Sequence, residues 1–335
     1  MSNKTLGCAI DVGTMNFLSA RQEEEGAVAI KRMRNAFLDL DASHKRFLQL
    51  SDVNYIEKDG KVLIVGDEAM DVANMFQREA RRPMQRGLIS SREMDSAEVL
   101  SLMIEQLLGT PQVKDEVCYF SVPAAPVDDP SQDIIFHEGV FRRMIGEHGY
   151  DAQPMNEAAA ICFSEAESDG FSALTFSFGS GMTNCALTYR TLTTMSFSVA
   201  RGGDWIDEKV AQACNITASK AVSIKEKEAD LIDFASGNPR TLRAREAIGV
   251  YYRNLIGYAL DHVESQLLKV QTEIPMAIPI IIGGGTSLAR NFLPFFKEEF
   301  AKRKNFPIEI SEIRHASNPM NAVAKGLLVN ARLSY

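Results

Sequence analysis

Three glycine-containing turns carry the residue types that can bind a phosphate or a nucleotide. The first turn is Asp11-Val12-Gly13-Thr14-Met15-Asn16, the second runs from Ser177 to Asn184, and the third is Gly283-Gly284-Gly285-Thr286-Ser287. Glycine lets backbone N–H donors approach an anion closely, so all three are candidate phosphate or nucleotide contacts. A purely structural turn is the alternative at each of them.

The first turn adds side-chain chemistry to its backbone donors. Asp11 stands at the end of an apolar segment, where a carboxylate can hold a hydrated magnesium ion. Thr14 and Asn16 offer polar side chains beside it. By itself, however, an Asp-x-Gly-Thr sequence is more typical of an ordinary hairpin.

The other two turns strengthen the prediction by their positions. The second turn falls at the same point of a strand meander as the first, so the two could clamp a triphosphate from both sides. In the third, a buried strand leads into three glycines, whose conformational entropy makes them costly to order. A base or ribose lying against backbone without Cβ atoms would account for them.

The turns are positioned by two predicted strand meanders. The first consists of strands at 6–12, 17–20 and 27–32, and the second of strands at 174–178, 183–189 and 194–199. Each meander has its glycine turn after its first strand, which indicates an internal duplication of architecture. The other expected elements are a hairpin at 53–66, strands at 117–122 and 278–282, and helices at 67–81, 96–108, 131–148, 158–166, 204–248, 248–270 and 321–333.

Composition excludes several classes of protein. Hydrophobic residues make up 45% and charged residues 24% of 335 residues, which is typical of a globular chain of about two lobes. A net charge of −8 argues against direct binding of nucleic acid. The five cysteines lack metal-site spacing, and neither a signal-peptide core nor a membrane-spanning run is present, so we expect a cytoplasmic protein.

Several other residues have ordinary structural interpretations. We expect His137, His148 and His262 to be surface or capping histidines, and Trp205 to pack between helices. The run 225–228 reads as a solvated helix face, and the arginines at 78, 81, 82 and 86 as a solvated helix and loop.

The order of these motifs resembles the superfamily of actin, MreB and the 70-kDa heat-shock chaperones. AIDVGTMNF is similar to the first phosphate loop of MreB, and DGKVLIVGDEAMDVA with RRPMQRGLIS resembles the segments around its smaller subdomain. SVPAAP and MNEAAAI resemble a strand and the first connecting segment, and SVARGGDWIDEKVAQ the Gly-Gly-Asp helix. IIIGGGTSLA and NPMNAVAKGLL resemble the adenosine loop and the second connecting helix, so the resemblance spans residues 6–330.

The resemblance implies a fold and a domain organisation. It implies an α/β, two-lobed actin-like ATPase fold made of duplicated ribonuclease-H-like domains with two small inserted subdomains. The first lobe would comprise 1–158 and 313–335 with an insertion at about 34–81. The second lobe would comprise 159–312 with an insertion at about 208–248.

The resemblance also implies residue roles toward ATP or ADP and Mg²⁺. Asp11 would contact magnesium and take part in catalysis, and Glu157 would lie near the attacking water, although Asp128, Asp129 and Gln132 are alternatives for that role. The nucleotide would contact the three turns, the Gly-Gly-Asp segment and the helix facing it, through Gly13, Thr14, Met15, Asn16, Gly179, Ser180, Gly181, Met182, Thr183, Gly202, Gly203, Asp204, Lys225, Glu226, Gly283, Gly284, Gly285 and Thr286.

One departure from the family pattern affects catalysis. The second phosphate loop of the family normally begins with an aspartate that orders magnesium and its waters, and here that position is Ser177. A hydroxyl carries no charge, so we expect weaker magnesium binding and slow hydrolysis while nucleotide binding survives.

Two functions remain open on this fold. The first is a cytoskeletal protein that polymerises head to tail with bound ATP. The second is a non-polymerising nucleotide-binding scaffold, or pseudo-ATPase, that recruits an adaptor protein. The length argues against a sugar kinase, and the end at Tyr335 against a chaperone with a peptide-binding domain. The N-terminus resembles no membrane anchor, so a role away from the membrane is as well supported as a role in cell shape.

Overall fold

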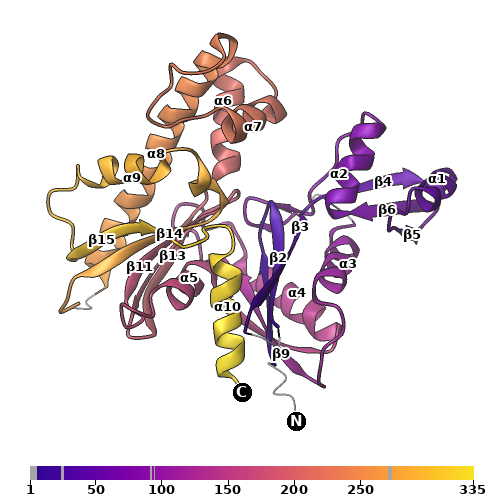
Figure 1. Cartoon of the computed structure of the whole chain (residues 1–335), viewed down its shortest axis with the longest axis horizontal. Coiled ribbons are helices and arrows are strands. Elements are labelled where there is room, and N and C mark those ends of the chain that lie inside the picture. The colour runs from indigo at the N-terminus through magenta and orange to yellow at the C-terminus, as the bar shows by residue number, and fades with distance from the viewer. Residues whose placement is uncertain (1–5, 24–25, 91–92, 94, 271–273) are drawn as a thin grey trace. The chain divides into compact units, whose positions relative to one another are not determined.

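A computed structural model describes residues 6–335 apart from 24–25, 91–92, 94 and 271–273 (Figure 1). The chain divides into two compact units. Unit 1 comprises Met1–Val122, Ile134–Met155 and Leu327–Tyr335, and unit 2 comprises Pro123–Asp133 and Asn156–Gly326.

Unit 1 is built on a five-stranded sheet of order β10-β9-β1-β2-β3. The first three strands in the chain, β1 (Cys8–Val12), β2 (Asn16–Gln22) and β3 (Val28–Arg34), form the expected antiparallel meander. β9 (Glu116–Val122) is parallel to β1, and β10 (Tyr150–Asn156) lies beyond β9. One face of this sheet forms a core with helices α3 (Ser96–Leu108) and α4 (Ile134–Glu147).

A small sheet of order β4-β6-β5 also belongs to unit 1. Its core packs against α2. The elements here are β4 (Phe37–Asp41), η1 (Ala42–His44), α1 (Lys45–Leu50), β5 (Ile56–Lys58), β6 (Lys61–Val65), α2 (Gly66–Met75) and the two-stranded β7 (Met84–Gln85) and β8 (Leu88–Ile89).

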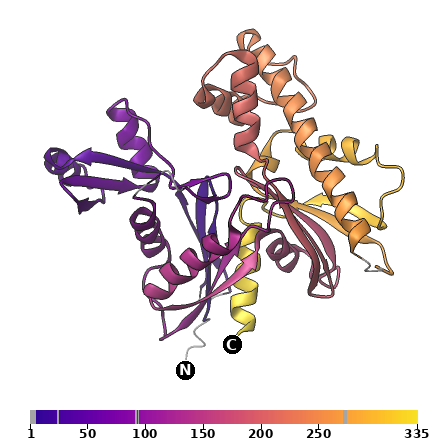
Figure 2. The same cartoon turned by 180° about the vertical axis from the view of Figure 1, so that it is seen from behind.

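Unit 2 repeats the main architecture. Its five-stranded sheet has the order β13-β12-β11-β14-β15, from β11 (Ala173–Phe178), β12 (Thr183–Tyr189), β13 (Leu192–Val199), β14 (Ile278–Gly283) and β15 (Ile310–His315). Figure 2 shows the long helix α8 (Leu242–Lys269) in orange alongside this sheet. The remaining elements are α5 (Glu157–Glu165), α6 (Gly203–Cys214), α7 (Ala218–Lys227), η2 (Pro239–Thr241), η3 (Gly285–Leu288) and α9 (Phe292–Phe300), and α10 (Ala322–Leu333) runs from unit 2 into unit 1.

The two sheets have the same topology. In each, an antiparallel meander is extended by a strand parallel to its first strand, β9 beside β1 and β14 beside β11. The duplication of architecture predicted from the two meanders is therefore confirmed.

Several element predictions were wrong, for local physical reasons. The helix expected at 67–81 ends at Met75, because Gln77 adopts a positive φ and Arg81 exchanges backbone hydrogen bonds with Phe37. The segment 204–248, expected to be helical, is broken twice. The helix α6 ends at Cys214, where Asn215 has a positive φ, and α7 ends at Lys227, after which the Asp230 side chain caps a turn by accepting from the N–H groups of Ile232 and Asp233. Among the described residues, no helix is both long and apolar enough to cross a bilayer.

Candidate functional site

The first glycine turn connects β1 to β2 in unit 1. The N–H of Gly13 donates to the carbonyl of Asn16 at 3.2 Å, and a Cβ on Gly13 would lie 2.7 Å from that oxygen. Glycine is therefore required here by close approach of the backbone. Within the described part of the chain, the N–H groups of Thr14 and Met15 have no hydrogen-bond acceptor. They are donors for an anion.

Asp11 lies just before this turn and is held by the neighbouring parallel strand. Ser121 of β9 donates its hydroxyl to Asp11 Oδ1 at 2.8 Å, and the Val12 N–H donates to the same hydroxyl at 2.8 Å. Burial raises the pKa of Asp11 to about 6, with the Ser121 hydrogen bond opposing the shift. A cation at this carboxylate would favour its charged form.

The second glycine turn connects β11 to β12 in unit 2 and has the same internal geometry. The N–H of Gly179 donates to the carbonyl of Met182 at 3.0 Å, and a Cβ on Gly179 would lie 2.9 Å from that oxygen. Among the described residues, the N–H groups of Ser180, Gly181 and Met182 have no acceptor, and the buried Ser180 hydroxyl has no partner. This turn thus presents a set of donors equivalent to that of the first turn.

The Gly-Gly-Asp segment packs directly on the second turn. At the start of α6, Gly203 N–H donates to Gly179 O at 3.0 Å and Asp204 N–H donates to Ser180 O at 2.8 Å. A Cβ on Gly202 would lie 2.5 Å from Ser180 O, so only glycine allows this contact. The segments 179–183 and 202–204, both predicted to contact the nucleotide, therefore pack against each other in unit 2.

The third turn joins the same structure. Thr286 donates its hydroxyl to Gly179 O at 2.8 Å, and Tyr252 of α8 donates its hydroxyl to Thr286 O at 3.0 Å. Gly284 has φ +89°, and a Cβ there would lie 2.4 Å from Phe178 O. Packing alone therefore requires Gly284 to be glycine.

Lys225 of α7 lies at the same place. Its Nζ donates to Gly203 O at 3.0 Å and pairs with Asp207 Oδ2 at 2.6 Å, both side chains being largely buried. A Cβ on Gly203 would lie 2.6 Å from Thr286 Oγ1 and 3.1 Å from Lys225 Nζ. The interpretation of this lysine as part of a solvated face was wrong, because it shares a face of α7 with the buried Ala221. Its neighbour Glu226 is exposed.

We call the set formed by Gly179, Ser180, Gly202, Gly203, Lys225 and Thr286 the platform of unit 2. Four predicted segments far apart in the sequence, around 180, 203, 225 and 286, meet in it. Its acidic partner Asp207 has a pKa raised to about 6 by burial, an effect that the Lys225 charge opposes.

Glu157, the carboxylate predicted to lie near the attacking water, is the first residue of α5 in unit 2. Its Oε2 accepts from the Ser177 hydroxyl at 3.4 Å and from Asn184 Nδ2 at 3.1 Å. Asn184 Oδ1 in turn accepts from the Ala124 N–H at 2.8 Å. The serine at the acid position of the second turn thus hydrogen-bonds to the predicted acid.

The alternative candidates for activating the water, Asp128 and Asp129, have other hydrogen-bond partners. Asp128 accepts from the Ala200 N–H at 2.8 Å and from the Tyr258 hydroxyl at 3.0 Å. Asp129 accepts from Gln132 Nε2 at 3.0 Å. Asp128 therefore already anchors the 123–133 segment to Ala200, which directly follows β13, and to Tyr258 of α8.

Each turn, taken within its own unit, offers donors that suit a nucleotide phosphate, and the first turn has a carboxylate that suits magnesium. Among the described residues, each turn has backbone N–H donors without acceptors, and its glycine is required by the close approach of the turn's own carbonyl. No group of three or more His, Cys, Asp or Glu side chains that could hold a metal occurs among the described residues. Magnesium typically takes one or two carboxylates plus substrate phosphates, so Asp11 alone suits it.

Two side-chain predictions have clear outcomes. Trp205 packs edge-on against Tyr251 of α8, as expected. His137 was wrongly predicted at the surface: it is 1% exposed, its ring contacts Phe141, and Nδ1 accepts from the Ile89 N–H. Burial lowers its pKa to about 4.

Sequence reasoning gave no role to four residues that shape these sites: Ser121, Asn184, Asp207 and Tyr252. Asp207 was detectable, because it lies four residues after Gly203 on the face of a helix that begins at a glycine pair. Ser121 lies within β9, a strand that no sequence motif linked to Asp11.

Comparison with known proteins gives the class and then the family. Solved structures with a similar backbone include a MamK double-helical filament, with TM-score 0.72 and 16% identity over 97% of this chain and 98% of that one. MreB5 of Spiroplasma citri bound to AMPPNP matches with TM-score 0.65 and 16% identity over 96% and 94%. The ethanolamine utilisation protein EutJ from Carboxydothermus hydrogenoformans matches with TM-score 0.52 and 15% identity over 96% and 88%. The chain has the actin-like ATPase fold.

The family model that matches the chain is Volactin, over residues 6–331, so the protein belongs to the volactin family. No curated protein matches it.

Proposed function

We propose that the chain binds ATP with Mg²⁺ and polymerises into cytoskeletal filaments while hydrolysing the nucleotide slowly. The observation that carries the proposal is the platform of unit 2, in which four segments predicted to contact a nucleotide pack together. An actin-like fold shared with a MamK filament and with nucleotide-bound MreB5 supports the same function. The cytoplasm is the compartment in which such a filament would act.

Each part of the proposed site has a role that its contacts support. The N–H groups of Thr14, Met15, Ser180, Gly181 and Met182 would donate to phosphate oxygens. The platform would lie against ribose and base, with Lys225 able to donate a third hydrogen bond.

Asp11 would hold the magnesium ion, which supplies charge neutralisation at the phosphates when bound. Glu157 would orient the attacking water. Its hydrogen bonds to Ser177 and Asn184 fix the orientation of the carboxylate.

A second function is supported by one observation, the serine at position 177. Without a carboxylate there, the chain would act as a nucleotide-binding scaffold or pseudo-ATPase that does not polymerise and recruits a partner protein. The two functions share the nucleotide and differ in turnover and self-assembly.

Phosphate release separates the two functions. We expect slow release from wild type with Mg²⁺ and ATP, and faster release from Ser177→Asp, with Ser177→Asn as the uncharged control of similar size. Absence of turnover in both wild type and Ser177→Asp would contradict an ATPase.

Sedimentation and negative-stain electron microscopy test assembly. The protein is expected to pellet as filaments with ATP and Mg²⁺ and to remain in the supernatant without nucleotide. Particles of monomer size under both conditions, at a concentration of tens of micromolar, would favour the scaffold.

A further inference from the structure

Two cysteines of unit 1 lie side by side on neighbouring strands. Cys8 of β1 and Cys118 of β9 are register partners in the parallel pair, and both belong to the same core cluster. Adjacent strands lie about 4.8 Å apart, which falls within the Cα separations of about 4.4–6.8 Å found in disulfides. Each thiol donates to a backbone carbonyl of β9, Cys8 to Val117 O at 4.0 Å and Cys118 to Tyr119 O at 3.9 Å.

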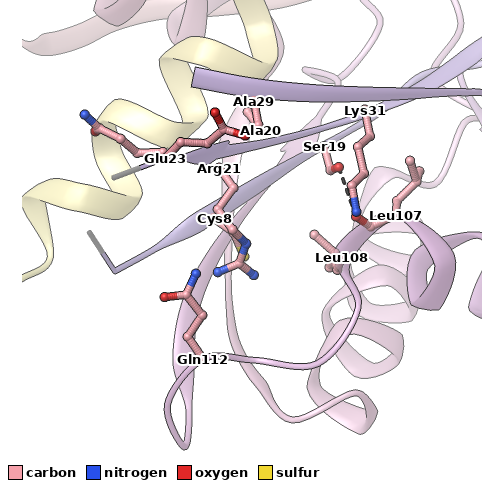
Figure 3. Close-up of a pocket in the computed structure, with 11 residues that line it drawn as sticks. Cys8, Ser19, Ala20, Arg21, Glu23, Ala29, Lys31, Leu107, Leu108 and Gln112 are labelled. Carbon is pink, nitrogen blue, oxygen red and sulfur yellow. Dashed lines mark hydrogen bonds between the residues drawn. The ribbon is translucent and has the colours of Figure 1, made fainter. Parts of the chain in front are cut away.

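A cavity gives access to one of the two thiols. Cys8 lines a cavity of about 480 Å³ together with Ser19, Arg21, Lys31, Leu107 and Gln112 (Figure 3). Both thiols are buried, Cys8 at 1% exposure and Cys118 at 0%, but only Cys8 belongs to the cavity lining. A small polar reagent in the cavity would therefore meet Cys8 first.

The cavity wall beside Cys8 carries both charges, since Arg21, Lys31 and Glu23 all line it. Arg21 lies beside Cys8 in Figure 3, and its Nη1 pairs with buried Glu116 at 2.5 Å while Nη2 donates to the Tyr150 hydroxyl at 3.2 Å. These partners fix the guanidinium next to the sulfur. An arginine beside a sulfur favours the thiolate form, and the carboxylate of Glu116 paired with Arg21 opposes that effect.

We propose that Cys8 and Cys118 are a redox modification site at which hydrogen peroxide forms a reversible disulfide. Cys8 sulfur attacks one peroxide oxygen, the O–O bond breaks, and one water leaves as Cys8 becomes a sulfenic acid. Cys118 sulfur then attacks Cys8 sulfur, the S–O bond breaks, and a second water leaves with the Cys118 proton. Two thiols are oxidised to one disulfide as one peroxide is reduced to two waters, and a dithiol reverses the reaction.

The disulfide would act on the first glycine turn. Asp11 and Ser121 lie three residues after Cys8 and Cys118 on the same two strands, and the Ser121 hydroxyl holds both the Asp11 carboxylate and the Val12 N–H. A covalent link with its own preferred geometry would change the spacing of β1 and β9 at this point. Resting on the proposed function, this predicts weaker ATP binding by oxidised protein.

Peptide mapping tests the disulfide without any nucleotide. Native protein is treated with hydrogen peroxide, quenched, denatured, alkylated and digested with trypsin. We expect the titre of free thiols to fall from five to three and a cross-link between the peptides that contain Cys8 and Cys118. Five free thiols, or oxidation without this cross-link, would overturn the proposal.

Variants show whether the pair acts as a unit. Cys8→Ala and Cys118→Ala should each abolish the cross-link, whereas Cys214→Ala, which removes a partly exposed thiol of unit 2, should leave it intact. The peptide map of the oxidised wild-type protein tests the disulfide even if one of the cysteine variants does not fold. A disulfide that forms without changing ATP affinity would overturn the coupling to Asp11, while no ATP binding by reduced protein would contradict the proposed function instead.

Discussion

Replacing Gly202 by alanine tests the packing of the unit 2 platform. The new Cβ would lie 2.5 Å from Ser180 O and 2.7 Å from Gly179 O, both backbone atoms that no side-chain rotation can move. Gly202 has φ −152°, which alanine tolerates, so the penalty is purely steric. Overpacking of this kind costs about 1–3 kcal/mol.

The backbone must therefore separate in Gly202→Ala. Separation weakens the hydrogen bonds from Gly203 N–H and Asp204 N–H to the second turn, each of about 1 kcal/mol. The turn then loses the position that its free N–H groups need, and ATP affinity should fall together with the free energy of unfolding.

Gly257→Ala is the matched control, because Gly257 lies in α8 of the same unit and a Cβ there would meet only Arg303 Nη2 at 3.9 Å. Alanine is favoured over glycine in a helix by about 1 kcal/mol, so this variant should be as stable as wild type or more so. Urea unfolding and titration with a fluorescent ATP analogue measure both quantities. Equal stability and affinity of Gly202→Ala and wild type would refute the packing argument.

Two further predictions concern buried charge. Between pH 6.5 and about 4, unfolded chains bind a proton at His137 that the folded protein excludes. The free energy of unfolding should therefore fall with falling pH by up to about 3 kcal/mol. Urea unfolding measured across this pH range should show that His137→Asn loses the dependence. If the free energy of unfolding of the variant depends on pH as in wild type, other groups cause the dependence. Asp207→Asn leaves Lys225 buried without its counter-charge and should destabilise the protein by about 3–5 kcal/mol. Adding Lys225→Met should restore stability but not ATP binding; recovery of both would exclude a nucleotide role for Lys225.

The helices and strands predicted well from the sequence are those with regularly spaced apolar residues or with clear turn residues at their ends. The helix Ser96–Leu108 and the strand Thr183–Tyr189 match their predicted bounds, since each has regular apolar spacing ended by glycine or turn residues. Strand Tyr150–Asn156 was not predicted because Pro154 interrupts it, and Ile310–His315 because its exposed charged residues hide the alternation. Both are edge strands, where polar side chains and proline are tolerated.

Site residues were predictable where a motif carries them and not where tertiary packing does. Glycine turns signal close backbone approach in the sequence itself. The pairing of Lys225 with Asp207 depends on how α6 and α7 pack, which no spacing within either helix reveals. His137 was recoverable, because it precedes the buried Phe141 and Met144 by four and seven residues on one face of α4.

Calorimetric titration of the purified protein with ATP and Mg²⁺ tests the central claim most directly. We expect saturable binding of one nucleotide per chain, weakened in Gly202→Ala and retained in Gly257→Ala. Absence of binding by wild type at millimolar ATP, or equal binding by both variants, would contradict it.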